Sequence, residues 1–264
     1  MEARNYIESE DFPPHAQRVF IVGNYGSGKT EVAVNLALAL RARGVAVRLA
    51  DLDIVNPYFR SREARALLEA HGVGVVVPPG AQSFADLPIV VPEIRGMLQP
   101  KPGDGLALFD VGGDDVGARM LSSFHDHLPE GGYELWQVLN SRRPFTDSLE
   151  GCLRMRASIE EASRLRVTGL ISNAHLVTET TPEVIAEGLA LARQVAEASG
   201  LPLRFFTAMG ELAADPRVRG LDGPLLRLER RMLPPWLRPA GAPEDDPDLP
   251  AARPTPLGRP RRMD

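Results

Sequence analysis

The feature that most constrains this chain of 264 residues is a glycine-rich segment, residues 23–30, with the sequence GNYGSGKT. A β-branched, apolar run at 19–22 precedes it, and a helical pattern of apolar residues follows it from 29 to about 43. A strand, a glycine loop and a helix in this order match the G-x-x-x-x-G-K-[ST] phosphate loop in the context that the motif requires. The segment therefore predicts a nucleotide phosphate site.

The chemistry of this loop follows from its geometry. Glycines let the backbone wrap closely enough for its N–H groups to point at phosphate oxygens, and the new helix adds its positive N-terminal end. Lys29 would reach the β- and γ-phosphates, and the Thr30 hydroxyl would ligate Mg²⁺. The residues expected to bind nucleotide through this loop are Gly23, Asn24, Tyr25, Gly26, Ser27, Gly28, Lys29 and Thr30.

Acidic residues follow two further apolar runs. Asp51 and Asp53 follow a predicted strand at 45–50, where one carboxylate could enter the metal shell and the other could orient an attacking water or hydroxyl. Asp110 ends a strand at 106–109, the Walker B arrangement, in which the carboxylate reaches Mg²⁺ directly or through water. Gly113 would let its N–H swing toward a γ-phosphate.

The strand expected at 167–172 is followed by Asn173, which could hydrogen-bond an adenine edge. The guanine-reading N-K-x-D tetrad is absent, since Ala174 replaces the lysine and Leu176 stands at the last position. The sequence therefore favours ATP over GTP, with Mg²⁺ as the accompanying ion.

Apolar runs alternate with helical patterns along most of the chain. This order predicts an α/β fold, a three-layer α/β/α sandwich around a mainly parallel sheet of about seven strands, with ligands at the C-terminal strand ends. The expected strands are 18–22, 45–50, 73–77, 106–109, 135–140, 167–172 and 203–207. The expected helices are 29–43, 61–70, 89–98, 116–127, 148–164 and 181–199. We expect an N-terminal extension at 1–16, a P-loop domain at 17–238 and a Pro-rich disordered tail at 239–264.

Composition excludes several classes of protein. The net charge of −5 argues against a dedicated nucleic-acid binder, and no stretch approaches the 18 apolar residues of a membrane span. The single cysteine, Cys152, excludes an internal disulfide framework, suits a reducing cytoplasm, and is expected to be a small buried residue. We therefore expect a cytoplasmic protein without a membrane span.

Taken together, the phosphate loop, Asp-x-Asp, Asp-x-Gly-Gly and the Asn after the sixth strand resemble the SIMIBI class of P-loop NTPases over about residues 17–210, and the MinD/ParA/CooC-type ATPases in particular. The resemblance implies an ATP-promoted homodimer with nucleotide at the interface. By position it assigns Lys29 to the phosphates, Thr30 and Asp110 to Mg²⁺, and Asp53 to the attacking water. Asp51 lies nearby, and Asp53 is also assigned to the metal shell.

One departure from that family concerns its signature lysine, which follows the first glycine of the loop and reaches the partner's nucleotide. Asn24 stands there in this chain, and Tyr25 replaces a small residue. Arg60, Arg119 or Arg142 could supply the missing cation, and the sequence does not choose among them. We therefore expect slow or partner-dependent hydrolysis.

Three functions remain open at this point. The first is an ATPase switch acting on a protein partner, for example in metalloenzyme or redox-enzyme assembly. The second is a P-loop kinase or ligase acting on a small molecule or nucleic-acid end, with Asp51 or Asp53 activating the acceptor and residues 56–60 and 142–143 shaping its pocket. The third is a membrane-positioned regulator, in which 225–233 forms an amphipathic anchor; a C-terminal helix packed on the core is the favoured interpretation of that segment.

Overall fold

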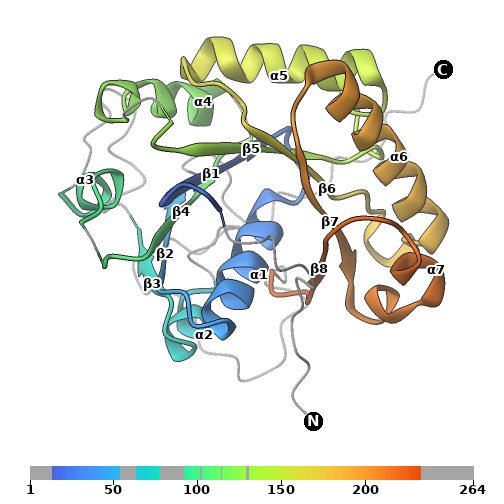
Figure 1. Ribbon diagram of the computed structural model, residues 1–264, viewed down its shortest axis with the longest axis horizontal. Helices are drawn as coiled ribbons and strands as arrows, with labels where there is room; N and C mark the ends of the chain where they lie inside the picture. The colour runs from blue at the N-terminus through green and yellow to red at the C-terminus, as the bar shows by residue number, and fades with distance from the viewer. Residues whose placement is uncertain are drawn as a thin grey trace, which may run out of the picture.

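The computed structural model describes residues 14–53, 64–77, 92–101, 103–113, 115–128 and 131–232. In these ranges the strands form one eight-stranded sheet in the order β3-β2-β4-β1-β5-β6-β7-β8, and every neighbouring pair is parallel. Helices cover the sheet on both faces (Figure 1). The predicted three-layer α/β/α architecture is confirmed.

The bounds of the elements are as follows. The strands are β1 Arg18–Gly23, β2 Val47–Leu52, β3 Gly74–Val76, β4 Leu106–Val111, β5 Glu134–Leu139, β6 Gly169–Ser172, β7 Leu203–Met209 and β8 Leu225–Leu228. The α-helices are α1 Lys29–Ala42, α2 Arg65–Ala70, α3 Pro92–Leu98, α4 Asp115–Ser122, α5 Leu149–Ser163, α6 Pro182–Ser199 and α7 Pro216–Arg219. Short 3₁₀ helices are η2 His125–His127, η3 Val177–Glu179 and η4 Gly210–Ala214.

The sheet is buried on both faces because its strands are apolar at successive positions. In β1, Val19 and Ile21 belong to the apolar cluster that includes α1, whereas Phe20 and Val22 belong to the cluster that includes α5 and α6. Period-two alternation along a strand sends neighbouring side chains to opposite faces, so both sets need a covering layer. The central strand β1 therefore carries the phosphate loop out of the middle of the core.

Two helix starts follow the local sequence closely. The Ser148 hydroxyl accepts a hydrogen bond from Gly151 N at 3.2 Å, and the Thr181 hydroxyl accepts one from Val184 N at 3.4 Å. Each satisfies a backbone donor that the first helical turn leaves unpaired, and Pro182 needs no such partner. The predicted N-cap at Thr181 is confirmed.

The C-terminal part of the described chain corrects the prediction for residues 225–233. The sheet adds an eighth strand to the seven predicted ones, because Leu225–Leu228 forms β8 alongside β7. The segment 225–233 is therefore neither a packed helix nor an amphipathic helical anchor within the described residues, which end at 232. Leu226 and Leu228 are buried while their neighbours are only half-buried, and this period-two pattern is typical of an edge strand.

Several predicted elements have different bounds in the structure. The strand expected at 45–50 is shifted by two residues to Val47–Leu52, and the helix expected at 116–127 is divided into α4 and the short η2. Among the described residues, no helix has the length and apolar character needed to cross a membrane. The predicted tail at 239–264, and residues 1–13 of the predicted N-terminal extension, lie outside the described residues.

Candidate functional site

The phosphate loop joins β1 directly to α1, and two of its glycines have backbone conformations in which any other residue would be strained. Gly26 and Gly28 have φ values of +70° and +87°. A Cβ atom on Gly28 would lie only 2.3 Å from the amide nitrogen of Asn173. Helix α1 begins immediately afterwards at Lys29, so its first backbone N–H groups and positive end face this loop.

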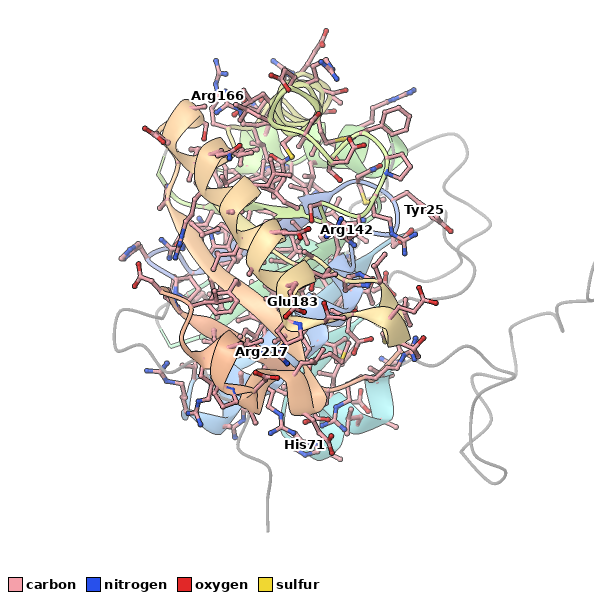
Figure 2. All side chains as sticks on the ribbon, turned by 90° about the vertical axis from the view of Figure 1, so that its right-hand side faces the viewer. Tyr25, His71, Arg142, Arg166, Glu183 and Arg217 are labelled. Atoms are coloured by element: carbon pink, nitrogen blue, oxygen red, sulfur yellow. The ribbon has the colours of Figure 1, made fainter. Side chains whose placement is uncertain are left out.

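Asn24, at the position of the signature lysine, is committed to contacts within the chain. Its Nδ2 donates to Pro144 O at 2.7 Å, and its Oδ1 accepts from Tyr25 N at 2.8 Å. Tyr25 is 68% exposed and extends from the loop at the edge of the molecule (Figure 2). Asn24 thus fastens the loop to the segment between β5 and α5.

Two cationic side chains hold carbonyl groups of the phosphate loop. The Lys29 ammonium donates to Asn24 O at 3.1 Å, and Arg143 Nε donates to Gly26 O at 3.0 Å. Arg142, by contrast, pairs with Glu187 on α6. Of the proposed replacement cations, Arg119 is exposed on α4 and Arg60 lies outside the described residues. Among the described residues, the arginine that bonds to the phosphate loop is therefore Arg143, the neighbour of the proposed Arg142.

The predicted acidic residues come together beside the loop. Asp51 and Asp110 are register partners on β2 and β4 and both are fully buried, while Asp53 is nearly so. Asp51 Oδ1 accepts a hydrogen bond from Asp53 N at 3.0 Å. Parallel strands end at one edge, which is why carboxylates distant in sequence meet here.

Asp110 is the most perturbed of these groups. Burial, reinforced by the charge of Asp51, raises its pKa from 3.8 to about 8, although Lys29 and the Thr30 hydroxyl act in the opposite direction. Neither carboxylate oxygen has a hydrogen-bond partner of normal geometry within the described part of the chain. An unpartnered buried carboxylate is costly, and a bound cation is one of the groups that would satisfy it.

The donor set suits Mg²⁺ held jointly with phosphates. In the ranges that the structure describes, no group of three or more His, Cys, Asp or Glu residues could hold a metal ion unaided. Mg²⁺ is usually bound through one or two carboxylates, with waters and substrate phosphates completing its octahedral shell. Asp110 and Thr30, with Asp53 beside them, therefore fit the predicted role.

Gly113, the predicted switch glycine, packs directly against the phosphate loop. A Cβ atom at Gly113 would lie 2.5 Å from Lys29 Nζ and 3.0 Å from both the N and Cα atoms of Tyr25. Any side chain at this position would displace the loop or the lysine. The β4–α4 segment and the phosphate loop are thus in contact.

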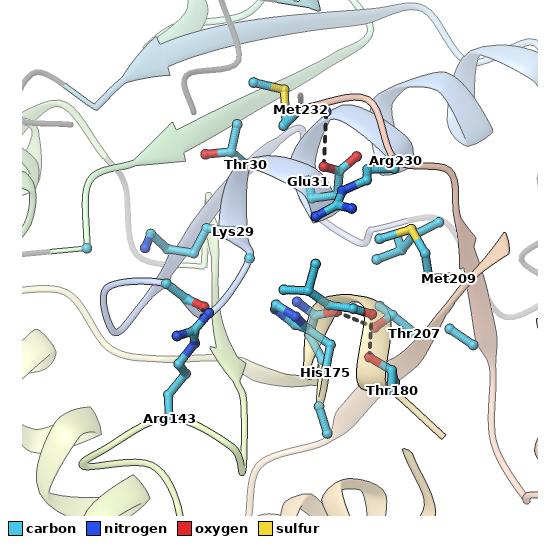
Figure 3. A pocket seen from close by; sticks show the side chains of 18 of the residues that line it. Lys29, Thr30, Glu31, Arg143, His175, Thr180, Thr207, Met209, Arg230 and Met232 are labelled. Atoms are coloured by element: carbon cyan, nitrogen blue, oxygen red, sulfur yellow. Dashed lines mark hydrogen bonds between the residues drawn. The ribbon is translucent and has the colours of Figure 1, made fainter. Parts of the chain in front are cut away.

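A cavity of about 340 Å³ extends from these groups toward β7 and β8 (Figure 3). At one end it is lined by Lys29, Thr30, Asp53 and Gly113. Away from Lys29 the lining includes the apolar side chains of Ile185, Met209 and Leu228, together with the polar side chains of His175, Thr180, Thr207 and Arg230. A phosphate-binding part joined to a partly apolar part matches the two halves of a nucleotide.

Asn173 lines the cavity beside the phosphate loop, but its side-chain amide is already engaged. Its Nδ2 donates to Ser27 O at 2.6 Å, and its Oδ1 accepts a hydrogen bond from the Thr207 hydroxyl. These bonds brace the phosphate loop from β6 and β7. That Asn173 also contacts the adenine edge stays a prediction.

His175 and Arg230, which were not among the predicted site residues, also line the cavity. Burial, together with the positive charges of Arg143 and Arg230, lowers the pKa of His175 from 6.5 to about 4, so its imidazole is neutral at pH 7. His175 follows Asn173 closely and could have been inferred from that motif. Arg230 could have been found only by recognising the alternation of β8.

Comparison with known proteins identifies relatives by structure alone. No family model matches the sequence, and no curated protein sequence matches it. The 54 kDa signal recognition particle protein of Aeropyrum pernix, solved with GDP, has a TM-score of 0.50 and 20% identity over 74% of this chain and 42% of its own. FtsY from Mycoplasma mycoides has a TM-score of 0.50 and 17% identity over 78% of this chain and 64% of its own. Chloroplast FtsY from Physcomitrella patens has a TM-score of 0.50 and 18% identity over 74% of this chain and 59% of its own.

The chain thus spans less than two thirds of the length of these proteins. At such low identity the likeness concerns the fold, and these neighbours belong to the SIMIBI class of P-loop NTPases named from the motifs. The closer likeness to MinD/ParA-type ATPases stays a prediction. This chain has the α/β P-loop NTPase fold.

Proposed function

We propose that this chain is a Mg²⁺-dependent ATP-binding switch that hydrolyses ATP slowly or on contact with a protein partner. The observation that carries the proposal is a cavity that joins Lys29 and Thr30 to a partly apolar region lined by residues of β7 and β8. The unpartnered carboxylate of Asp110 lies beside its phosphate end. A nucleoside triphosphate with its metal ion supplies a group for each of these features.

Within this proposal, Lys29 would stabilise the phosphates, Thr30 and Asp110 would hold Mg²⁺, and Asp53 would orient the attacking water. The bound Mg²⁺ would neutralise charge that develops on the phosphates. Lys29 would have to exchange its present bond to Asn24 O for phosphate oxygens. Gly113 packs closely against Lys29 and the Tyr25 backbone, so its backbone would have to move when Lys29 changes partner.

The choice of ATP rests on the residues that face the nucleoside end. Guanine recognition in P-loop GTPases needs a carboxylate for the ring N–H groups, and Leu176 stands at that position here. Among the described lining residues the carboxylates are Glu31 and Asp53. Glu31 already accepts hydrogen bonds from the backbone of Arg231 and Met232, and Asp53 lies at the phosphate end.

Slow or stimulated turnover is supported by the contacts of Asn24. Its amide is bonded inside the chain, so it does not extend toward a second subunit as the family's lysine does. A protein partner is supported by four large apolar side chains that are exposed in the described part of the chain, Tyr25, Phe145, Leu176 and Val177, of which Tyr25 and Val177 line the cavity. The partner would be a second copy or a client protein such as a metalloenzyme under assembly. Of the acceptor pocket expected for the kinase alternative, residues 56–60 lie outside the described ranges, Arg142 pairs with Glu187, and Arg143 holds the phosphate loop.

The test uses the two lysines of the chain, Lys29 and Lys101. Titration calorimetry would compare Mg²⁺-ATP, Mg²⁺-ADP and Mg²⁺-GTP with the wild-type protein, K29A and the exposed-site control K101A. We expect ATP to bind more tightly than GTP, K29A to lose at least about tenfold in affinity, and K101A to match the wild type. Absence of ATP binding by the wild type would refute the proposal, and tighter GTP binding would refute its choice of nucleotide. Sedimentation with a non-hydrolysable ATP analogue would test for the homodimer.

A further inference from the structure

Residues 229–232, which follow β8, are fastened to helix α1 beside the phosphate loop. Asn35 Oδ1 accepts from Glu229 N at 2.8 Å, and Asn35 Nδ2 donates to Glu229 O at 3.0 Å. The two carboxylate oxygens of Glu31 accept from Arg231 N at 2.6 Å and Met232 N at 3.1 Å. Both α1 side chains are largely buried, so these bonds fix the path of the segment.

This path directs alternate side chains into the cavity. Leu228, Arg230 and Met232 line it, whereas Glu229 and Arg231 do not. The spacing is that of an extended chain, in which successive side chains point to opposite sides. The side chain of Arg230 extends from the segment into the cavity (Figure 3).

The charge of Arg230 acts on groups at opposite sides of the cavity. Burial raises the pKa of Glu31 on α1, and the charge of Arg230 opposes that rise; burial lowers the pKa of His175 in the loop after β6, and the charge of Arg230 adds to that fall. Within the described part of the chain its guanidinium makes no hydrogen bond or salt bridge. The planar cation therefore lies over the cavity with its faces and donors available.

The surroundings of Arg230 favour a flat ring over a phosphate. Arg230 lies beside Glu31 and away from Lys29 (Figure 3), and it stands in the chain between Leu228 and Met232, which also line the cavity, as does Met209 of β7. A guanidinium stacks well on an aromatic face, and thioether sulfurs make favourable contacts with ring edges. A neutral imidazole at His175 adds no second charge there.

We propose that residues 229–232 form the wall of the base site and that Arg230 stacks its guanidinium on the adenine ring. This inference rests on the proposed function, because it names the contact of the same nucleotide's base. It makes Arg230 a binding residue for the nucleoside half, with Glu31 and Asn35 as its positioning residues.

The experiment compares substitutions that separate the shape of arginine from its charge. R230Y keeps a flat face without charge, R230K keeps the charge without the flat face, and R230A removes both. R231A is the matched control, because it removes a neighbouring exposed charge whose side chain is outside the cavity lining. Each variant is titrated with Mg²⁺-ATP and with inorganic triphosphate, and its urea unfolding is measured to establish that it folds.

We expect R230A to weaken ATP binding by about tenfold and triphosphate binding by less than about twofold, since cation–π stacking is typically of this size. R230Y should stay within about threefold of the wild type and bind ATP more tightly than R230K. R231A should match the wild type with both ligands. If R230Y does not fold, the two ligands measured with R230A and R230K still decide the question.

Two results would overturn the inference. If R230A loses affinity for ATP and for triphosphate equally, and R230K binds both as tightly as the wild type, Arg230 contacts the phosphates instead. Unchanged ATP binding by R230A would remove it from the site. Failure of the wild type to bind ATP at all would instead refute the proposed function, so the two failures are distinguishable.

Discussion

Replacing Asp110 with asparagine should stabilise the protein in the absence of Mg²⁺ and nucleotide, while abolishing its binding of Mg²⁺-ATP. Asp110 is fully buried, its carboxylate oxygens have no hydrogen-bond partner of normal geometry in the described ranges, and Asp51 lies opposite it on the next strand. Burying such a carboxylate lowers the free energy of unfolding, and a bound ligand can compensate for this loss. The substitution keeps the shape of the side chain and removes its charge.

The magnitude follows from the raised pKa of about 8, compared with 3.8 for an exposed aspartate. Between these pH values the folded state holds a proton that the unfolded state releases, so the free energy of unfolding falls as pH rises. One pKa unit corresponds to about 1.4 kcal/mol, so the interval from 3.8 to pH 7 has an upper limit of about 4 kcal/mol. Because Asp51 shares the titration, we expect D110N to gain about 2 to 3 kcal/mol relative to the wild type between pH 5 and pH 7.5.

The assay is urea denaturation in the presence of a chelator at pH 5, 6 and 7.5, repeated with Mg²⁺-ATP. The control is D222N, which removes a fully exposed carboxylate and should leave the pH dependence unchanged. Mg²⁺-ATP should raise the unfolding midpoint of the wild type and of D222N, but not that of D110N. Parallel pH profiles for D110N and the wild type would refute the reasoning, because they would show that Asp110 does not titrate in this interval.

Three further predictions concern other members of the site and the lone thiol. The pKa of His175 is lowered to about 4, so the unfolded state binds more protons than the folded state between pH 6.5 and 4. The free energy of unfolding therefore falls as pH falls through that window. In acid unfolding measurements, H175Q should lessen this loss of stability by about 2 kcal/mol. R143A should weaken Mg²⁺-ATP binding by about tenfold in calorimetry because it releases the carbonyl of Gly26, whereas R142A should have little effect; equal effects would contradict the assignment. Burial raises the pKa of Cys152 to about 11, so the native protein should react with iodoacetamide at pH 8 far more slowly than the urea-unfolded protein, as mass spectrometry would show.

The parts of the fold that local sequence determines could be predicted. The strand, loop and helix around residues 18–42 are contiguous, and their apolar spacing differs clearly between strand and helix. The position of Asp110 followed from the end of an apolar strand, and Thr181 from its capping chemistry. Each of these inferences needed only a few neighbouring residues.

The contacts that complete the site depend on residues far apart in the chain. Asn24 is fixed by Pro144, and Glu31 is fixed by Arg231 and Met232, about 200 positions away. The apolar periodicity of the sequence does not indicate polar contacts between residues so far apart. The four-residue strand β8 is also too short to distinguish a period of two from one face of a helix, which explains the wrong interpretation of 225–233.

The bonds from Glu31 and Asn35 to residues 229–232 have a consequence for the order of events during synthesis. Glu31 leaves the ribosome long before its partners, so its carboxylate has no backbone donors from Arg231 and Met232 until translation has passed them. A nascent chain that has not yet made β8 would hold α1 and the phosphate loop without one wall of the cavity. The last strand of the described residues would thus complete the cavity wall only late in synthesis.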